Sequence, residues 1–261
     1  MTAFTQAWLT SSAPIATLAI LAWVLCSLRR NVGLIDMFWP LFMLAAVITA
    51  VVRGNPPTTV GIAACAIVAL WALRLCVYLT ARNWSAPEDR RYQAIRARNG
   101  NHFVWTSLVT VFLFQAVLAW IVAAPAVAAV AFDVHSQWWN CLGAALALFG
   151  LLFESLADEQ LRQFKSNGQN ASRVLDTGLW RYSRHPNYFG EFCLWWGIFL
   201  LGARPGTLWT IVSPALMTLL LLRVSGVTLL EKDIAERRPA YRRYVARTSA
   251  FVPWFVRSDR A

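Results

Sequence analysis

Residues 60–80 read VGIAACAIVALWALRLCVYLT, and Arg74 is the only charged side chain among them. A run of this length and character matches the roughly 20 apolar residues that an α-helix needs to cross a bilayer. The whole chain is 58% hydrophobic and 14% charged, well below the about 25% charged residues of a typical soluble domain. Six further apolar runs are found at 10–28, 34–52, 104–130, 138–156, 189–203 and 207–230. The sequence therefore predicts an all-α, polytopic membrane protein with seven transmembrane helices.

Basic residues are distributed unevenly between the loops that join these predicted spans. Twenty of the 24 Lys and Arg residues fall in the loops after the first, third and fifth spans or in the tail after residue 230. The loops on the other side hold only Arg53 and Arg204. Because cytoplasmic loops are enriched in Lys and Arg, we expect an external N-terminus and a cytoplasmic C-terminus. The same rule accounts for the net charge of +11 without a nucleic-acid partner.

The predicted spans leave little sequence for a separate soluble domain, so we expect residues 1–261 to form a single membrane domain. The first basic residue is Arg29, and we expect the first span to be retained rather than cleaved as a signal peptide. Pro125 lies inside the fourth run, where it is expected to kink the helix or end it early. The five cysteines lie in apolar runs without a C-x-x-C pair, so neither disulfides nor a metal site is expected.

Several ionisable side chains lie inside or at the ends of the predicted spans, where each costs about 2.5–3.5 kcal/mol on insertion scales. They are Asp36, Arg74, Glu154, Asp158, Glu191 and Arg223. Most of them lie toward the cytoplasmic ends, so we expect a shared polar cavity that opens to the cytoplasm. Helical spacing puts four charged residues on one face, namely Glu154, Asp158, Arg162 and Lys165. The alternative for Asp158 and Arg162 is an ion pair on the helix surface.

The segment 178–191, GLWRYSRHPNYFGE, carries the densest group of polar and aromatic side chains. Its arginines can bind phosphate with forked geometry. Pro186 suits the first turn of a helix, and Asn187 and Glu191 are four residues apart, so they should share a helical face. An aromatic and basic belt at the lipid interface is the alternative. Such a belt does not require Asn and Glu at helical spacing, so we favour a binding site.

Residues 184–191, RHPNYFGE, resemble the signature of the steroid 5α-reductase superfamily, and the most similar branch is bacterial and related to 3-oxo-5α-steroid 4-dehydrogenases. Sterol reductases have a similar Arg-His-x-Asn-Tyr-x-Gly-Asp/Glu stretch, and isoprenylcysteine carboxyl methyltransferases a looser Arg-His-Pro-x-Tyr-x-Gly. The resemblance is clearest over about 150–255, including RRPAYRRY at 237–244 and FVP at 251–253. It implies a multi-pass protein of the bacterial inner membrane.

The resemblance also implies that NADPH binds at the cytoplasmic face, among the helices of 138–255, while the helices of 1–130 form the substrate side. Lys165 stands where the family has an arginine, so the positive charge remains but the two-pronged hydrogen-bond geometry of a guanidinium is lost. Arg223 and Glu231 are eight residues apart and are expected on one face. The expected cofactor residues are Asp158, Arg162, Lys165, Arg181, Tyr182, Arg184, His185, Asn187, Tyr188, Glu191, Arg223 and Glu231.

For catalysis, the family's reductases use an acid in span two and a tyrosine in span three. Asp36 matches the acid, and Trp71 occupies the tyrosine position, with Arg74 and Tyr78 keeping the pattern around it. An indole only donates a hydrogen bond and cannot transfer a proton as an acid. Either Asp36 acts alone or with another acid such as Tyr78, or the substrate is not a steroid enone.

The sequence thus predicts an NADPH-dependent reductase of a carbon–carbon double bond in a lipid or steroid-like substrate that enters from the bilayer. One alternative is a methyltransferase that uses S-adenosylmethionine, although Asn187 and Glu191 argue against it. A second is a transporter or a lipid-binding membrane protein, although inverted repeats are not visible. Membrane lipids are expected partners, also for the basic tail, and the oligomeric state is left open.

Overall fold

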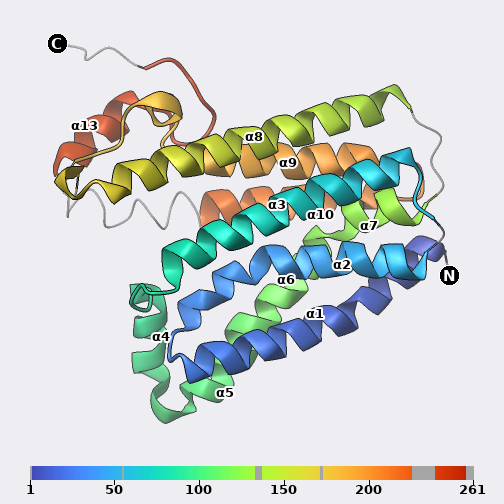
Figure 1. The fold of residues 1–261 in the computed structure, drawn as a ribbon, viewed down its shortest axis with the longest axis horizontal. Helices are drawn as coiled ribbons and strands as arrows, with labels where there is room; N and C mark the ends of the chain where they lie inside the picture. The colour runs from blue at the N-terminus through green and yellow to red at the C-terminus, as the bar shows by residue number, and fades with distance from the viewer. Residues whose placement is uncertain (1, 55, 133–136, 171–172, 225–238, 257–261) are drawn as a thin grey trace. The chain divides into compact units, whose positions relative to one another are not determined.

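The computed structural model describes residues 2–54, 56–132, 137–170, 173–224 and 239–256, and within these ranges every regular element is a helix (Figure 1). The α-helices are α1 (Ala3–Leu28), α2 (Trp39–Arg53), α3 (Thr59–Asn83), α4 (Arg90–Asn99), α5 (Phe103–Ser107), α6 (Phe114–Val122), α7 (Ala124–Ala131), α8 (Trp138–Ser166), α9 (Pro186–Gly202), α10 (Val212–Leu219) and α13 (Pro239–Arg247). Short 3-10 or π turns join them, among them η1 (Val32–Met37), η3 (Leu108–Leu113), η5 (Gly178–Arg181) and η7 (Leu220–Val224). The all-α prediction is confirmed for the described residues.

Among the described residues, five stretches are long and apolar enough to cross a membrane, which indicates an integral membrane protein. They are Ala3–Leu28, Val32–Arg53, Thr59–Asn83, Phe103–Val122 and Trp138–Ser166. Of the other two predicted spans, α9 has 17 residues, and the described part of 207–230 is the shorter apolar stretch Leu208–Arg223, while residues 225–230 lie outside the described residues. Seven crossings and the orientation of the termini therefore stay predictions.

Prolines explain where two of the predicted spans are divided. The run at 34–52 begins as the 3-10 turn η1, and α2 starts only at Trp39 with Pro40 in its first turn. The long run at 104–130 ends its helix at Val122, and α7 begins with Pro125 in its first turn. A proline lacks the amide hydrogen that a helix interior needs, whereas the first turn does not use it.

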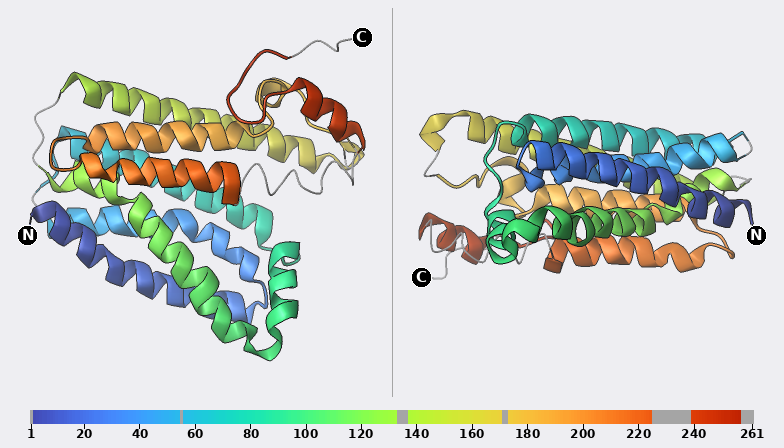
Figure 2. Two further views of the ribbon diagram at one scale, coloured as in Figure 1. Left: turned by 180° about the vertical axis from the view of Figure 1, so that it is seen from behind. Right: turned by 90° about the horizontal axis from the view of Figure 1, so that it is seen from below.

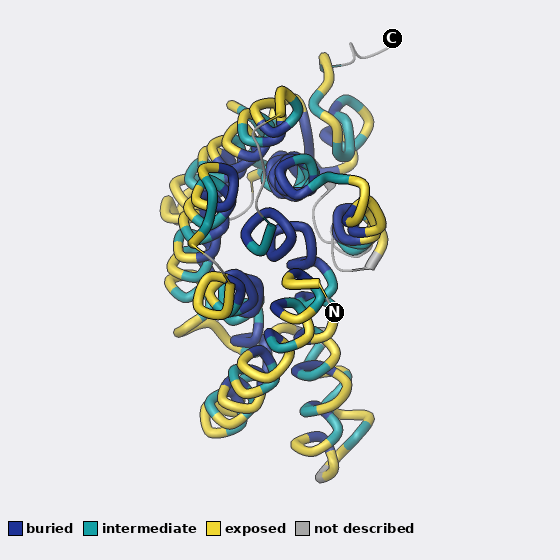
Figure 3. The backbone as a smooth tube through the Cα atoms, turned by 90° about the vertical axis from the view of Figure 1, so that its right-hand side faces the viewer, coloured by how far each residue is buried: buried dark blue, intermediate teal, exposed yellow. Residues whose placement is uncertain are grey.

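The chain divides into two compact units, and unit 1 consists of residues 1–141 and 201–213. Within it, α1 packs against α2, and α2 and α7 pack against α3. The helices bury one side and expose apolar residues on the other, and these exposed faces suit contact with lipid. Figure 3 shows buried and exposed positions alternating around the helical turns. Trp8 of α1 and Trp120 of α6 stack with ring centroids 4.1 Å apart, and each indole N–H donates to the other's backbone carbonyl at 3.0 and 2.8 Å.

Unit 2 consists of residues 142–200 and 214–261. Within it, α8 and α9 pack against each other in antiparallel orientation. The two helices lie side by side in Figures 1 and 2, with α13 near the C-terminal end of α8. Glycines on both helices allow the backbones to meet, because a Cβ on Gly150 would lie 2.4 Å from the Leu194 amide nitrogen. Small residues at such contacts are typical of helices packed in membranes.

Candidate functional site

Close packing of α8 on α9 brings buried acids to the start of the RHPNYFGE motif. A Cβ on Gly190 would lie 2.5 Å from the backbone nitrogen of Glu154, a distance that no other residue type tolerates. This glycine of the motif therefore lets the first turns of α9 lie directly against the segment of α8 that carries Glu154 and Asp158.

Three carboxyl groups are buried along this contact: Glu154 is 2% exposed, Asp158 3% and Glu191 8%. The Asn187 amide nitrogen donates a hydrogen bond of 3.2 Å to the Asp158 carboxylate. Asn187 and Glu191 are one helical turn apart on α9, which begins at Pro186 as the sequence predicts. Burying a carboxyl group is unfavourable unless polar partners offset the loss of its hydration. These three buried carboxyl groups therefore mark this part of unit 2 as a candidate functional site.

The other half of the motif holds the C-terminal segment in place. The Arg184 Nη1 donates to the carbonyl oxygens of Val245 at 2.8 Å and Thr248 at 3.1 Å, and its amide nitrogen donates to Ser249 at 2.8 Å. The Ser183 hydroxyl donates to the Phe251 carbonyl at 2.7 Å. Arg184 therefore has a structural role here in addition to any role toward a ligand.

A cavity of about 290 Å³ opens beside Arg184 within unit 2. Its lining consists of Arg184, Val245, Ala246, Arg247, Thr248, Ser249, Ala250, Trp254 and Phe255. Two guanidinium groups suit phosphate oxygens, and the exposed rings of Trp254 and Phe255 suit a planar heterocycle. This donor set fits part of a dinucleotide phosphate. Asp158 and Glu191 are buried on α8 and α9 and do not belong to the lining of this cavity.

The remaining cofactor candidates have different environments. His185 is buried and its ring stacks on Tyr188 with centroids 5.5 Å apart. Arg162 is exposed and pairs with Glu159 at 2.6 Å. The other exposed candidates are Lys165, Arg181, Tyr182 and Arg223, and Glu231 lies outside the described residues. The predicted four-residue face of α8 is therefore half buried, at Glu154 and Asp158, and half exposed.

The four predicted catalytic residues all belong to unit 1. Asp36 lies half-buried on η1, and α3 carries Trp71, fully buried, with Arg74 and Tyr78 half-buried. A hydrogen bond of 3.5 Å from the Thr80 hydroxyl to the Met37 sulfur joins α3 to η1. The Arg82 guanidinium lies over the Tyr78 ring, 5.6 Å from its centroid. Full burial makes Trp71 a packing residue of unit 1.

Sequence reasoning missed the polar groups that connect η5 to α8 and α13. The Trp180 indole donates to the Ala157 carbonyl at 3.0 Å, and the Gln160 side chain accepts from the Leu179 amide at 3.0 Å. The Tyr244 hydroxyl donates to the carbonyls of Trp180 and, at 3.2 Å, Ser183. Trp180 lies in the segment 178–191 and Tyr244 ends the RRPAYRRY stretch, so both had a sequence signal, whereas Gln160 had none.

An all-helical integral membrane chain with RHPNYFGE at a helix start, set against buried carboxyl groups, is of the steroid 5α-reductase-like class. The chain belongs to the family of proteins of unknown function DUF1295, which is of this class and whose profile matches residues 22–248. An uncharacterised protein of Schizosaccharomyces pombe is 26% identical over 166 residues, which cover 55% of this chain and 48% of that protein. This chain thus spans about half the length of that relative. No solved structure matches this chain.

Proposed function

We propose that this protein is an NADPH-dependent membrane reductase that acts on a carbon–carbon double bond in a lipid or steroid-like substrate. One observation carries the proposal: the RHPNYFGE motif of a steroid 5α-reductase-like chain lies beside a cavity lined by Arg184 and Arg247. We further propose seven crossings of the bacterial inner membrane, with the N-terminus outside and the C-terminus in the cytoplasm.

The residues of unit 2 would hold the cofactor, which supplies a hydride when bound. Arg247 and Arg184, which both line the cavity, would bind phosphate oxygens, and the exposed ring of Trp254 would stack on a heterocycle. The Asp158 carboxylate, oriented by Asn187, would accept hydrogen bonds from a ribose hydroxyl or the carboxamide.

In unit 1, the Asp36 carboxyl would donate a proton or a hydrogen bond to the substrate. Trp71 cannot replace the family's tyrosine in this role, because an indole has no acidic proton to give and this ring is fully buried. Tyr78 is therefore the second candidate donor on α3.

Cofactor titrations of the purified protein test the proposal. We expect NADPH to bind with a dissociation constant of micromolar order, and Arg247→Gln to weaken that binding about tenfold by removing one charge-assisted phosphate contact. Arg243→Gln is the matched control, because Arg243 is an exposed arginine of the same helix that does not line the cavity. Absence of NADPH binding together with binding of S-adenosylmethionine would instead establish the methyltransferase alternative.

A further inference from the structure

A second cavity, of about 160 Å³, lies in unit 1 where α1 ends, and the proposed reductase chemistry does not use it. Its lining consists of Ser27, Arg30, Val32, Arg96, Phe103, Val104 and Ser107. Two arginines and two serines thus line a space whose other lining residues are apolar. A cavity of this composition suits an anion that is attached to an apolar molecule.

Arg30 occupies a backbone position that normally takes glycine. Its φ is +51°, and it follows the last turn of α1 in a Schellman motif. The Arg30 amide donates to the Ser27 carbonyl at 3.1 Å, and the Asn31 amide donates to the Cys26 carbonyl at 3.0 Å. A left-handed conformation is unfavourable for arginine and free of strain for glycine. Arg30 therefore carries a backbone cost that glycine would avoid, and it lines the cavity.

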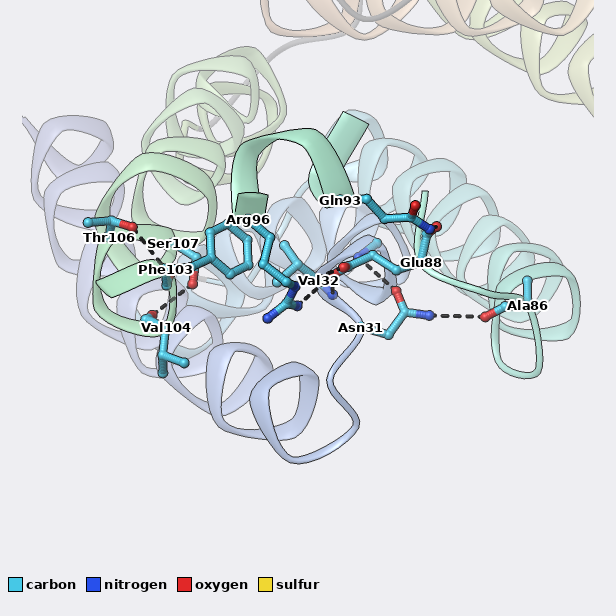
Figure 4. Close-up of polar contacts among 11 residues, drawn as sticks. Asn31, Val32, Ala86, Glu88, Gln93, Arg96, Phe103, Val104, Thr106 and Ser107 are labelled. Atoms are coloured by element: carbon cyan, nitrogen blue, oxygen red, sulfur yellow. Dashed lines mark hydrogen bonds and ion pairs between the residues drawn. The ribbon is translucent and has the colours of Figure 1, made fainter. Parts of the chain in front are cut away.

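Arg96 is fixed in place on the other side of the cavity. Its Nε and Nη2 donate to the Glu88 carboxylate at 3.0 and 2.7 Å, and its guanidinium lies 4.4 Å from the Phe103 ring centroid (Figure 4). Glu88 is itself held by the Val32 amide at 2.8 Å. A guanidinium has five N–H donors, so three are not used by Glu88. Arg96 is thus oriented before any ligand arrives, which lowers the entropic cost of binding.

The surroundings of the cavity match the boundary between lipid headgroups and acyl chains. The rings of Trp23 and Trp105 pack with centroids 5.3 Å apart, and the Trp23 indole donates to the Val104 carbonyl at 2.8 Å. Trp105 is 67% exposed and Leu28 is 78% exposed. Tryptophan is enriched at membrane–water interfaces, and exposed leucine beside it suits contact with acyl chains.

We propose that this cavity binds the phosphate group of an anionic membrane lipid, and that Arg30 and Arg96 bind the phosphate oxygens. Basic pockets between membrane helices bind anionic headgroups in this way. The apolar wall of Phe103 and Val104 and the neighbouring exposed Trp105 favour a lipid over a soluble phosphate, which would gain nothing from them.

Native mass spectrometry of the purified full chain with added phosphatidylglycerol, diacylglycerol or inorganic phosphate tests this site. We expect one phosphatidylglycerol retained per chain, little retention of diacylglycerol, and no binding of inorganic phosphate at comparable concentration. Arg30→Gly is expected to lower the affinity for phosphatidylglycerol about fivefold or more while it raises the thermal midpoint, because glycine relieves the backbone conformation. Such opposite effects exclude misfolding as the cause of lost binding.

Arg98→Gln is the matched control, because it removes an exposed charge from the same helix as Arg96 outside the cavity lining, and it should change neither quantity. The proposal is overturned if Arg30→Gly retains phosphatidylglycerol as the wild type does. It is also overturned if diacylglycerol is retained equally well, or if inorganic phosphate binds as tightly as the lipid.

Discussion

Glu88 connects three segments of unit 1, because it accepts hydrogen bonds from the Val32 amide and the Arg96 guanidinium. Burial raises the pKa of its carboxyl, but the hydrogen bonds from Arg96 and Val32 and the charge of Arg96 outweigh burial, so the net pKa lies below the ordinary value of 4.5. A carboxyl whose pKa is lowered by folding stabilises the fold above its unfolded pKa. That stabilisation is lost as the pH falls through the folded pKa.

We therefore expect Glu88→Gln to lower the free energy of unfolding by about 1–2 kcal/mol at neutral pH, since it weakens charge-assisted hydrogen bonds that are partly screened by solvent. The difference in the free energy of unfolding between variant and wild type should disappear as the pH falls below about 4.5. Thermal melts of both proteins across this range measure this difference, with the exposed Asp176→Asn as the control. A difference that is independent of pH would show that the ionised form of Glu88 is not what stabilises this region.

Asn187 and Arg184 show how far single residues of the site can be predicted. The motif and helical spacing assigned Asn187 and Asp158 to one site, and a hydrogen bond joins them. Arg184 was predicted as a phosphate ligand, and its bonds to the carbonyls of Val245 and Thr248 were not foreseen. Backbone carbonyls are common to every residue, so sequence carries no signal for which of them an arginine will reach.

At the scale of elements, the contact of α8 with α9 depends on Gly190. We expect Gly190→Ala to destabilise the protein by about 1–3 kcal/mol, because the added methyl group would overlap the Glu154 backbone and force the helices apart. Thermal denaturation and NADPH titration measure the effect, which should include weaker cofactor binding. Gly206→Ala is the control, since a Cβ there meets nothing within 4 Å. Equal stability of the two variants would mean that the helices do not need this close approach.

The ends of α8 and α3 show which helix boundaries hydropathy can predict. The apolar run at 60–80 predicts α3 to within three residues, since it is Thr59–Asn83. The run at 138–156 stops ten residues before α8 ends at Ser166, because its last turns carry charged residues such as Glu159 and Arg162. A helix that leaves the membrane continues through its backbone hydrogen bonds, which the polarity of its side chains does not interrupt.

At the scale of the whole molecule, the topology is open to a direct test. In a background without the five native cysteines, Arg53→Cys should react with a membrane-impermeant maleimide in intact spheroplasts, because Arg53 is predicted to lie outside. Arg98→Cys should react only after lysis, since its loop is predicted to be cytoplasmic. Reaction of both cysteines before lysis, or the reverse pattern, would contradict the proposed orientation.

Which residues belong to which of the two units could not be predicted from the sequence. Residues 201–213 follow α9 in the chain but belong to unit 1. The Asn140 amide donates to the Leu201 carbonyl at 3.1 Å, and the Ser213 hydroxyl donates to the Ile121 carbonyl at 2.7 Å. Both bonds join segments at least 61 residues apart along the chain, and no local pattern indicates them.

The bonds from Ser183 and Arg184 to residues 245–251 determine when during synthesis the site can form. These partners follow the motif by more than 60 residues, after the last predicted span. The helices can therefore enter the membrane while the motif still lacks its C-terminal partners. A nascent chain that terminates before Thr248 carries the membrane helices without these partners, so the site can assemble only after residue 251 has been translated.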